Sequence, residues 1–162
     1  CWVLPLFSYV MKKNAAAYSL LLAIVVVGGC AARQPAQPSQ TNRVRVGDQE
    51  LVVQLADTAA EQERGLAGVP SLSWDEGMLF VFSEAASHTF WMRGMMMPID
   101  IIWIAGSRVV GIEKSVPPPD AGARNQDLAL YPAPQPVDRV LETRSGFADR
   151  YGIQTGDMFA EE

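Results

Sequence analysis

The chain has 162 residues, of which 49% are hydrophobic and 19% are charged, and its formal charge is −5 at pH 7. This length and composition are typical of one globular domain with a real core. The acidic balance argues against nucleic acid or anionic lipid headgroups as partners, because both are bound by basic patches.

A secretory signal is indicated near the N-terminus. Residues 11–13, Met-Lys-Lys, supply a positive start, residues 20–27 are apolar, and small residues then lead to Cys30. This order resembles a bacterial lipobox, in which the cysteine is lipidated and becomes the first mature residue, although Val27 stands where leucine is usual. A transmembrane anchor is the alternative, but the apolar run is shorter than the ~20 residues of a span. We therefore expect residues 1–29 to be upstream residues and a signal peptide.

The mature chain is predicted to be anchored by lipid on the periplasmic side of the cell envelope. Cleavage before Cys30 would leave 11 basic and 18 acidic residues, a formal charge of −7. Cys30 would be the single cysteine and acylated, so no disulfide could form within the mature chain. A lipid group with several acyl chains would make the membrane a partner without a span. The absence of aspartate at position 31, where alanine stands, suggests the outer membrane.

Residues 30–42 are expected to be the lipidated cysteine and a flexible tether. They are mostly Ala, Gln, Pro and Ser and contain no large apolar residue. Such a segment cannot bury enough surface to order itself. The folded domain is therefore expected to cover residues 43–162.

Short apolar or alternating runs predict a domain made mainly of strands. Strands are expected at 43–46, 50–55, 78–82, 88–92, 100–105, 108–113 and 138–143, with a last short strand after residues 156–157. Turn signals at Gly47-Asp48 and Gly106-Ser107 indicate two hairpins.

Two short helices and one long loop complete the prediction. Thr58 and Glu61 fit a capping box, so a helix is expected to run from there to about Arg64. A second helix of one or two turns is expected at 145–151. Residues 116–136 hold six of the eleven prolines and predict a loop outside the sheet. Together the elements indicate a mainly β fold, a compact single-domain barrel-like or sandwich-like sheet with one or two short helices.

An ordered set of short motifs extends over residues 44–159. The motifs are Arg64-Gly-Leu66, Gly77-Met-Leu-Phe-Val-Phe82, Phe90-Trp-Met92, Pro98-Ile-Asp100, Val140-Leu-Glu142, Gly146 and Gly156-Asp157. Together they resemble the bacterial and archaeal family called domain of unknown function 192. The resemblance implies a small β-rich fold, often secreted, and no established activity.

The chain departs from the pattern of that family after two of its motifs. After Arg-Gly-Leu the family usually has methionine and, two positions further, a basic residue, where this chain has Ala67 and Val69. After Phe-Trp-Met the family usually has Lys-Asn-Thr, where this chain has Arg93, Gly94 and Met95. Arg93 keeps the charge, but two polar side chains are lost.

Methionines are the most concentrated candidate metal ligands, because their soft sulfur suits copper(I). The candidates are Met78, Met92, Met95, Met96 and Met97, together with His88. Methionine is commonly a gap-filler in cores, however, and consecutive residues on a strand point to opposite faces. We therefore expect packing and no metal site. Zinc is disfavoured because one histidine and no free thiol cannot supply its usual ligands.

No catalytic residue is assigned from the sequence, because no nucleophile elbow, phosphate loop or zinc-protease signature occurs. A hydrolase with paired carboxylates would draw on Asp100, Glu142 and Asp157. A buried Asp100 would need a partner. Arg64 or Arg93 could pair with it, or it could cap backbone amides at a turn. Asp157 is most simply a turn residue that caps local amides.

The tryptophans are candidate stacking surfaces for a ligand if they are exposed. Trp91 is expected in the core and Trp74 at the surface. The face of Trp103, in an all-apolar run, is undetermined.

The sequence thus predicts a lipid-anchored, cell-envelope binding or accessory domain, with no cofactor and with an unknown small molecule or envelope component as its ligand. The candidate ligand-binding residues are Arg64, Arg93, Asp100, Glu142 and Asp157, with the proline-rich loop as a flap. A carboxylate-dependent hydrolase and a copper(I)-handling protein that uses the methionine-rich segment are the alternatives.

Overall fold

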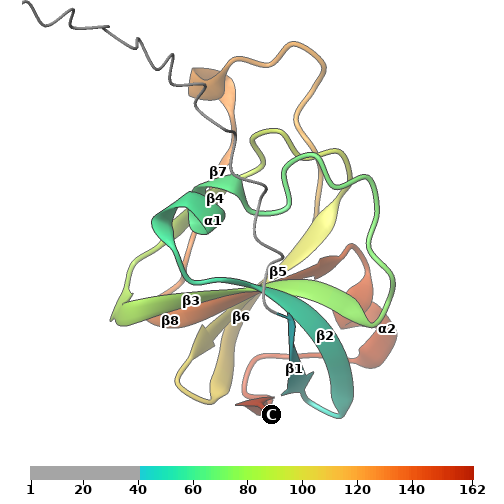
Figure 1. Cartoon of the computed structure of the whole chain (residues 1–162), viewed down its shortest axis with the longest axis vertical. Coiled ribbons are helices and arrows are strands. Elements are labelled where there is room, and N and C mark those ends of the chain that lie inside the picture. Colours follow the sequence, from blue (N-terminus) through green and yellow to red (C-terminus); the bar gives the residue numbers. More distant parts are fainter. Residues whose placement is uncertain (1–40) are drawn as a thin grey trace, which may run out of the picture. The chain divides into compact units, whose positions relative to one another are not determined.

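The computed structural model describes residues 41–162, so the predicted signal peptide, Cys30 and nearly all of the tether lie outside the described residues. The elements are β1 (Thr41–Val46), β2 (Gln49–Ala56), α1 (Ala59–Arg64), β3 (Glu76–Ala86), β4 (Thr89–Trp91), β5 (Ile99–Ala105), β6 (Arg108–Val116), the 3-10 turn η1 (Asn125–Asp127), β7 (Leu130–Pro132), β8 (Val137–Arg144), α2 (Phe147–Tyr151) and β9 (Phe159–Glu161) (Figure 1). Within residues 41–162, no helix is long and apolar enough to cross a membrane.

Seven strands form one sheet in the order β6-β5-β8-β3-β2-β1-β9, and only the β2–β3 pair is parallel. A bridge between Arg108 of β6 and Met158, just before β9, brings the two edges of the sheet together. The Val109 N–H donates to the Asp157 carbonyl at 2.9 Å beside this bridge. The sheet is therefore curled into a half-barrel, which confirms the expected mainly β single domain with two short helices.

Side-chain alternation divides the buried apolar residues between the two faces of the sheet. On β3, Leu79 belongs to one cluster, whereas Met78 and Phe80 belong to the other. The α2 face is the side covered by Phe147 and Ala148 of α2. The α1 face is the other side, which is covered by α1, the loops and the ribbon of β4 and β7 (Figure 1).

The predicted hairpins and the capping box are confirmed. Strands β1 and β2 pair around Gly47-Asp48, and β5 and β6 pair around Gly106-Ser107. The Glu61 N–H donates to Thr58 Oγ1 at 3.3 Å, and the Thr58 N–H donates to Glu61 Oε2 at 3.1 Å. Both features depend on local interactions, which a short stretch of sequence determines.

Two expectations about the middle of the chain need correction. The strand expected at 88–92 is only β4, and it pairs with β7 in a separate two-stranded sheet. Residues 116–136 are therefore not all loop, since they contain η1 and β7. Pro132 is tolerated in β7 because this strand has a partner on only one side.

Trp91 is also not in the core, because its side chain is 46% exposed. Alternation along the short strand β4 turns Phe90 toward the α1 face and Trp91 outward. Trp103 is fully buried in the α1-face cluster, and Trp74 is half-buried against the α2-face cluster.

Candidate functional site

A cavity of about 190 Å³ lies on the α1 face. It lies between the end of α1, strands β3 and β4 and the turn that follows β4. Its lining residues are Gln62, Glu63, Arg64, Gly65, Leu66, Phe80, Phe82, His88, Thr89, Phe90, Trp91, Arg93, Met95 and Glu142.

The side chain of Gln62 connects helix α1 to the sheet. Gln62 Nε2 donates to the Ala56 carbonyl at 3.2 Å and to the Val81 carbonyl at 2.9 Å. Gly65 then ends the helix with a φ of +51°, and a Cβ at this position would lie 3.3 Å from Phe80 Cζ and 3.9 Å from Glu142 Oε2. The absence of a side chain at Gly65 thus lets the backbone approach the floor of the cavity.

Glu142, on the inner strand β8, provides a carboxyl group at this floor. It pairs in register with Met78 and Ile101, so its side chain lies on the α1 face with theirs. The residue is only 5% exposed, and among residues 41–162 no group forms a hydrogen bond with its Oε2 atom. Burial raises the pKa of Glu142 to about 8, because a low-dielectric surrounding disfavours the charged form.

Aromatic rings form the walls of the cavity. Phe90 packs edge-to-face against Phe80, with ring centroids 4.8 Å apart, and against Trp103 at 5.4 Å. His88 stacks on Phe82 at 3.5 Å, and its buried Nε2 has no hydrogen-bond partner among the described residues. Burial lowers the pKa of His88, so its ring is neutral at neutral pH.

Two arginines lie at the mouth of the cavity. Arg93 forms an ion pair with Glu63 at 2.9 Å, and its guanidinium carbon lies 4.9 Å from the centre of the Trp91 ring. Arg64 is exposed, and within residues 41–162 no acidic side chain forms an ion pair with it. The mouth therefore carries one compensated and one uncompensated positive charge.

The two places where the chain departs from the family pattern meet beside this mouth. A Cβ at Gly94 would lie 3.2 Å from the Cβ of Ala67. The Gly68 N–H donates to the Gly94 carbonyl at 2.9 Å. Small residues at positions 67 and 94 thus allow the loop after α1 to approach the turn after β4.

Three of the five sequence-predicted site residues line this cavity: Arg64, Arg93 and Glu142. Asp100 and Asp157 do not. The proline-rich segment 116–136, predicted as a flap, does not line it either, and part of this segment lines a separate hollow of about 260 Å³ together with Met92. A third hollow, of about 300 Å³, lies beside Arg144. Only the first cavity contains any of the buried side-chain atoms that lack a partner among the described residues.

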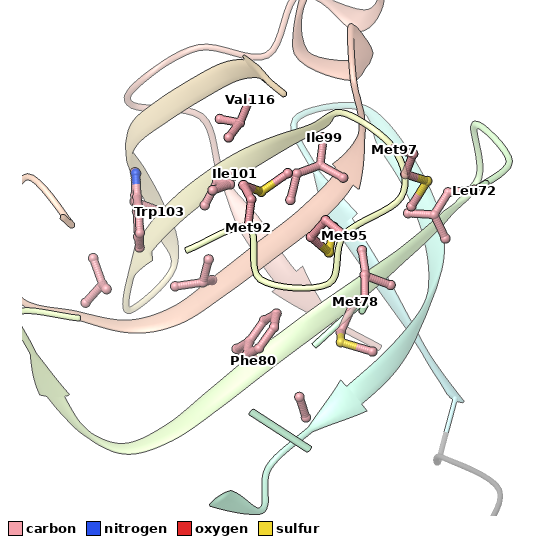
Figure 2. Packing of buried hydrophobic residues seen from close by; sticks show 14 residues of the cluster. Leu72, Met78, Phe80, Met92, Met95, Met97, Ile99, Ile101, Trp103 and Val116 are labelled. Carbon is pink, nitrogen blue, oxygen red and sulfur yellow. The ribbon is translucent and has the colours of Figure 1, made fainter. Parts of the chain in front are cut away.

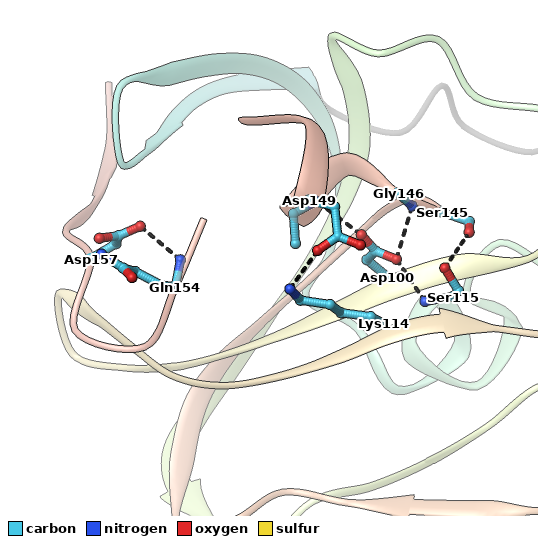
Figure 3. A network of polar contacts seen from close by, with 9 residues as sticks. Asp100, Lys114, Ser115, Ser145, Gly146, Asp149, Gln154 and Asp157 are labelled. Carbon is cyan, nitrogen blue, oxygen red and sulfur yellow. Dashed lines mark hydrogen bonds and ion pairs between the residues drawn. The ribbon is translucent and has the colours of Figure 1, made fainter. Parts of the chain in front are cut away.

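Asp100 lies on the α2 face, where both of its oxygens accept hydrogen bonds from backbone amides (Figure 3). Oδ1 accepts from Ser115 N at 2.8 Å and Gly146 N at 3.1 Å, and Oδ2 accepts from Ala148 N at 2.9 Å. Neither Arg64 nor Arg93 pairs with it, so of the two partners considered for this residue the backbone cap is the one observed. Asp100 therefore connects β5, the end of β6 and the start of α2.

Asp157 caps a local turn, as its sequence context indicated. Its Oδ2 accepts a hydrogen bond from Gln154 N at 2.9 Å (Figure 3). This turn leads into β9 and is separate from the cavity.

The cavity also contains residues that the sequence did not single out as ligand-binding candidates. Glu63, Phe80, Phe82 and Phe90 belong to it, and so does His88, which was considered only as a metal ligand or structural residue. The pairing of Glu63 with Arg93 joins positions 30 residues apart, and no local sequence pattern predicts such a contact.

The methionines are distributed through the core of the α1 face. Met78, Met92, Met95 and Met97 are buried among aliphatic and aromatic side chains, and Figure 2 shows them spread along the cluster. Met96 is 62% exposed. Among residues 41–162, no group of three His, Cys, Asp or Glu side chains could hold a metal ion.

The fold and the site define a class of protein, a small half-barrel domain with a cavity that has a polar floor and aromatic walls. The sequence pattern of domain of unknown function 192 (DUF192), described as "Uncharacterized ACR", matches residues 42–160. The chain belongs to this family. No curated protein matches it.

Two solved structures are similar to this chain over most of its length. A Novosphingobium aromaticivorans protein of unknown function is 34% identical, with a TM-score of 0.69, and the match covers 78% of this chain and 89% of that one. A Sinorhizobium meliloti protein described as a candidate transcription regulator is 27% identical, with a TM-score of 0.70 and coverage of 78% and 98%.

Proposed function

We propose that this domain binds a small molecule in the cavity between α1, β3 and β4. The observation that carries the proposal is the Glu142 carboxyl at the floor, which is buried and has an oxygen without a partner among residues 41–162. Buried polar groups are normally hydrogen-bonded, and an exception is a candidate for a functional role. Aromatic walls with a few convergent polar groups are typical of ligand pockets.

A thermal-shift screen of small molecules with the full chain, purified in detergent, tests this function. We expect at least one compound class to raise the melting temperature, because a ligand that binds only the folded state stabilises it. The Glu142→Gln variant should lose this response, whereas the matched Glu50→Gln variant, on an exposed position of β2, should keep it. A screen without any stabilising compound, or with equal responses in both variants, would contradict the proposal.

A carboxylate-dependent hydrolase is the second candidate, and the raised pKa of Glu142 favours it. A carboxyl group that is protonated at neutral pH can act as a general acid. Of the three acids considered for such a mechanism, only Glu142 lines the cavity, and the other carboxylate there, Glu63, is paired with Arg93. Hydrolytic turnover of a compound found in the screen, abolished by Glu142→Gln and retained by Glu50→Gln, would support this candidate.

We also propose that the domain is anchored to the cell envelope through Cys30. The lipobox-like residues 27–30 and the polar residues that follow them support this location. The Sinorhizobium meliloti protein is described as a candidate transcription regulator. We do not propose this role here, because DNA binding needs a basic surface and the mature chain is acidic. Labelled fatty acid should enter the full chain but not its Cys30→Ala variant, and equal labelling of both would exclude the anchor.

A further inference from the structure

We propose that the ligand of this cavity is a small primary amine whose ammonium group ion-pairs with Glu142 among the aromatic rings that line the walls. The inference rests on the proposed function and names the class of ligand.

The first argument is that no positively charged side chain of the described residues pairs with the carboxyl group at the floor of the cavity. Among residues 41–162, no lysine or arginine forms an ion pair with Glu142. An isolated carboxylate is costly to bury, and the cost is offset by an opposite charge with good hydrogen-bond geometry. An ammonium group brings this charge together with three N–H donors. It therefore satisfies the Oε2 atom that has no partner within the described chain.

The walls provide the second argument. Four of the residues that line the cavity are Phe80, Phe82, Phe90 and Trp91. The faces of aromatic rings carry negative charge density and attract cations, and sites built from several such rings bind organic ammonium ions. An anionic ligand would meet the Glu142 carboxyl, so its charge would be disfavoured at the floor.

The third argument is the size of the cavity, which limits the size of the ligand. The cavity has a volume of about 190 Å³. A cavity of roughly 150 Å³ in a protein core accommodates benzene. A ring of six atoms with a short amine-bearing arm therefore fits, and benzylamine is the simplest compound with these parts.

The ionisable groups around Glu142 set how binding depends on pH. Glu63 and Arg93 compensate one another at the mouth, His88 is neutral, and Arg64 is exposed, so water and salt screen it. Glu142 itself is protonated at neutral pH, because burial raises its pKa to about 8. Amine binding needs the carboxylate, so binding at pH 7 releases the Glu142 proton to the buffer.

Titration calorimetry with benzylamine, benzyl alcohol and benzoate tests this inference, because the three compounds share a ring and differ in charge. With the full chain in detergent, we expect benzylamine alone to bind. Its affinity should rise about tenfold from pH 6 to pH 7, as one proton is released per ligand. The apparent heat should differ between buffers of different ionisation enthalpy by the amount for one proton.

Two variants separate the possible outcomes. Glu142→Gln should abolish benzylamine binding, whereas Glu50→Gln should leave it unchanged. Tighter binding of benzyl alcohol or benzoate, or an affinity independent of pH, would overturn the amine inference while supporting a small-molecule pocket. If none of the three compounds binds, the amine inference is overturned, and the proposed function is decided separately by the thermal-shift screen.

Discussion

Asp100 and Glu142 are both buried carboxyl groups, and the surroundings of their oxygens differ. Three backbone N–H groups donate to Asp100. Glu142 has an oxygen with no partner among residues 41–162. A buried oxygen that accepts hydrogen bonds from the backbone is part of the folded framework, whereas a buried oxygen without a partner is an exception that needs an explanation. Asp100 is thus built into the fold, and Glu142 is the acid to which we assign the proposed ligand.

We expect Glu142 to make the stability of the protein depend on pH. The pKa of its carboxyl is about 8 in the folded protein, against an ordinary value of 4.5. Between these values the folded state holds a proton that the unfolded state has lost, so the free energy of unfolding falls as the pH rises from 5 to 8. The fall amounts to a few kcal/mol, since each pKa unit is worth about 1.4 kcal/mol.

Urea unfolding of the wild type and the Glu142→Gln variant at pH 5 and pH 8 measures this effect. The variant should lose little stability over this range, and at pH 8 it should be the more stable of the two proteins. Parallel pH curves for the two proteins would show that Glu142 is not a buried acid.

Removing the charge of Asp100 should destabilise the fold without closing the cavity on the other face. We expect Asp100→Asn to lower the free energy of unfolding by roughly 2–3 kcal/mol, because one of the two oxygens that accept the backbone amides is replaced by a donor. Asp157→Asn, at a partly exposed turn, is the control and should cost less than about 1 kcal/mol. Chemical denaturation measures both, and equal losses would contradict the structural role of Asp100.

Residue types alone identified part of the candidate site. Arg64, Arg93 and Glu142 were selected from motifs and charge, and all three line the cavity. Asp100 was selected by the same reasoning and lies on the opposite face. The register explains the difference, because Asp100 pairs with Thr143 and Ile101 pairs with Glu142, and neighbours along a strand point to opposite sides.

At the scale of elements, the contact between β3 and β8 leaves no space for a side chain at Gly77. A Cβ there would lie 2.7 Å from the Glu142 carbonyl oxygen, which is a backbone atom that cannot turn aside. Strand β8 carries Glu142, so a shift between these two strands also moves the floor of the cavity.

We expect Gly77→Ala to cost about 1–3 kcal/mol of stability through overpacking. It should also weaken the binding of any ligand that contacts Glu142. Ser83→Ala, at an exposed position of the same strand, is the control and should change stability by less than about 0.5 kcal/mol. Thermal unfolding and ligand titration of both variants provide the measurement. A Gly77→Ala protein as stable as the wild type would contradict the close approach of the strands.

Predictions of elements succeeded where the determining interactions are local. The capping box of α1 and the turns of two hairpins involve residues within a few positions of one another. The pairing of β4 with β7 instead joins residues about 40 positions apart, such as Phe90 and Tyr131. The proline content of the segment indicated only a loop, since nothing nearby in the chain marks Leu130–Pro132 as the partner of β4.

In the whole molecule, the two faces of the sheet carry different features. The α2 face contains the cluster that includes Phe159 of β9. Phe159 follows Met158, which forms the bridge between the two edges of the sheet. The α1 face carries the cavity. Changes at positions that are far apart and share no contacts generally have independent effects.

We therefore expect Phe159→Ala to reduce stability but not ligand binding. Truncation of a buried phenylalanine typically costs about 3–5 kcal/mol, and Phe159 is buried beside the contact between β6 and β9. The affinity of the folded protein for benzylamine, or for another compound that binds the cavity, should stay within about twofold of the wild type. Calorimetry well below the melting temperature measures this, and a large loss of affinity would show that the faces are coupled.

The sequence by itself determined the mainly β character, the two short helices, the main turns and the family. Each of these depends on patterns and caps that act over a few residues, or on motifs in a specific order. The tertiary structure decided which face each strand residue occupies, that β4 and β7 form a ribbon over the α1 face, and that Glu63 pairs with Arg93. It also decided that Glu142, and not Asp100, lies in a cavity with a free oxygen among the described residues. Strand pairing and register produce these results, and they arise between segments that are distant in the chain.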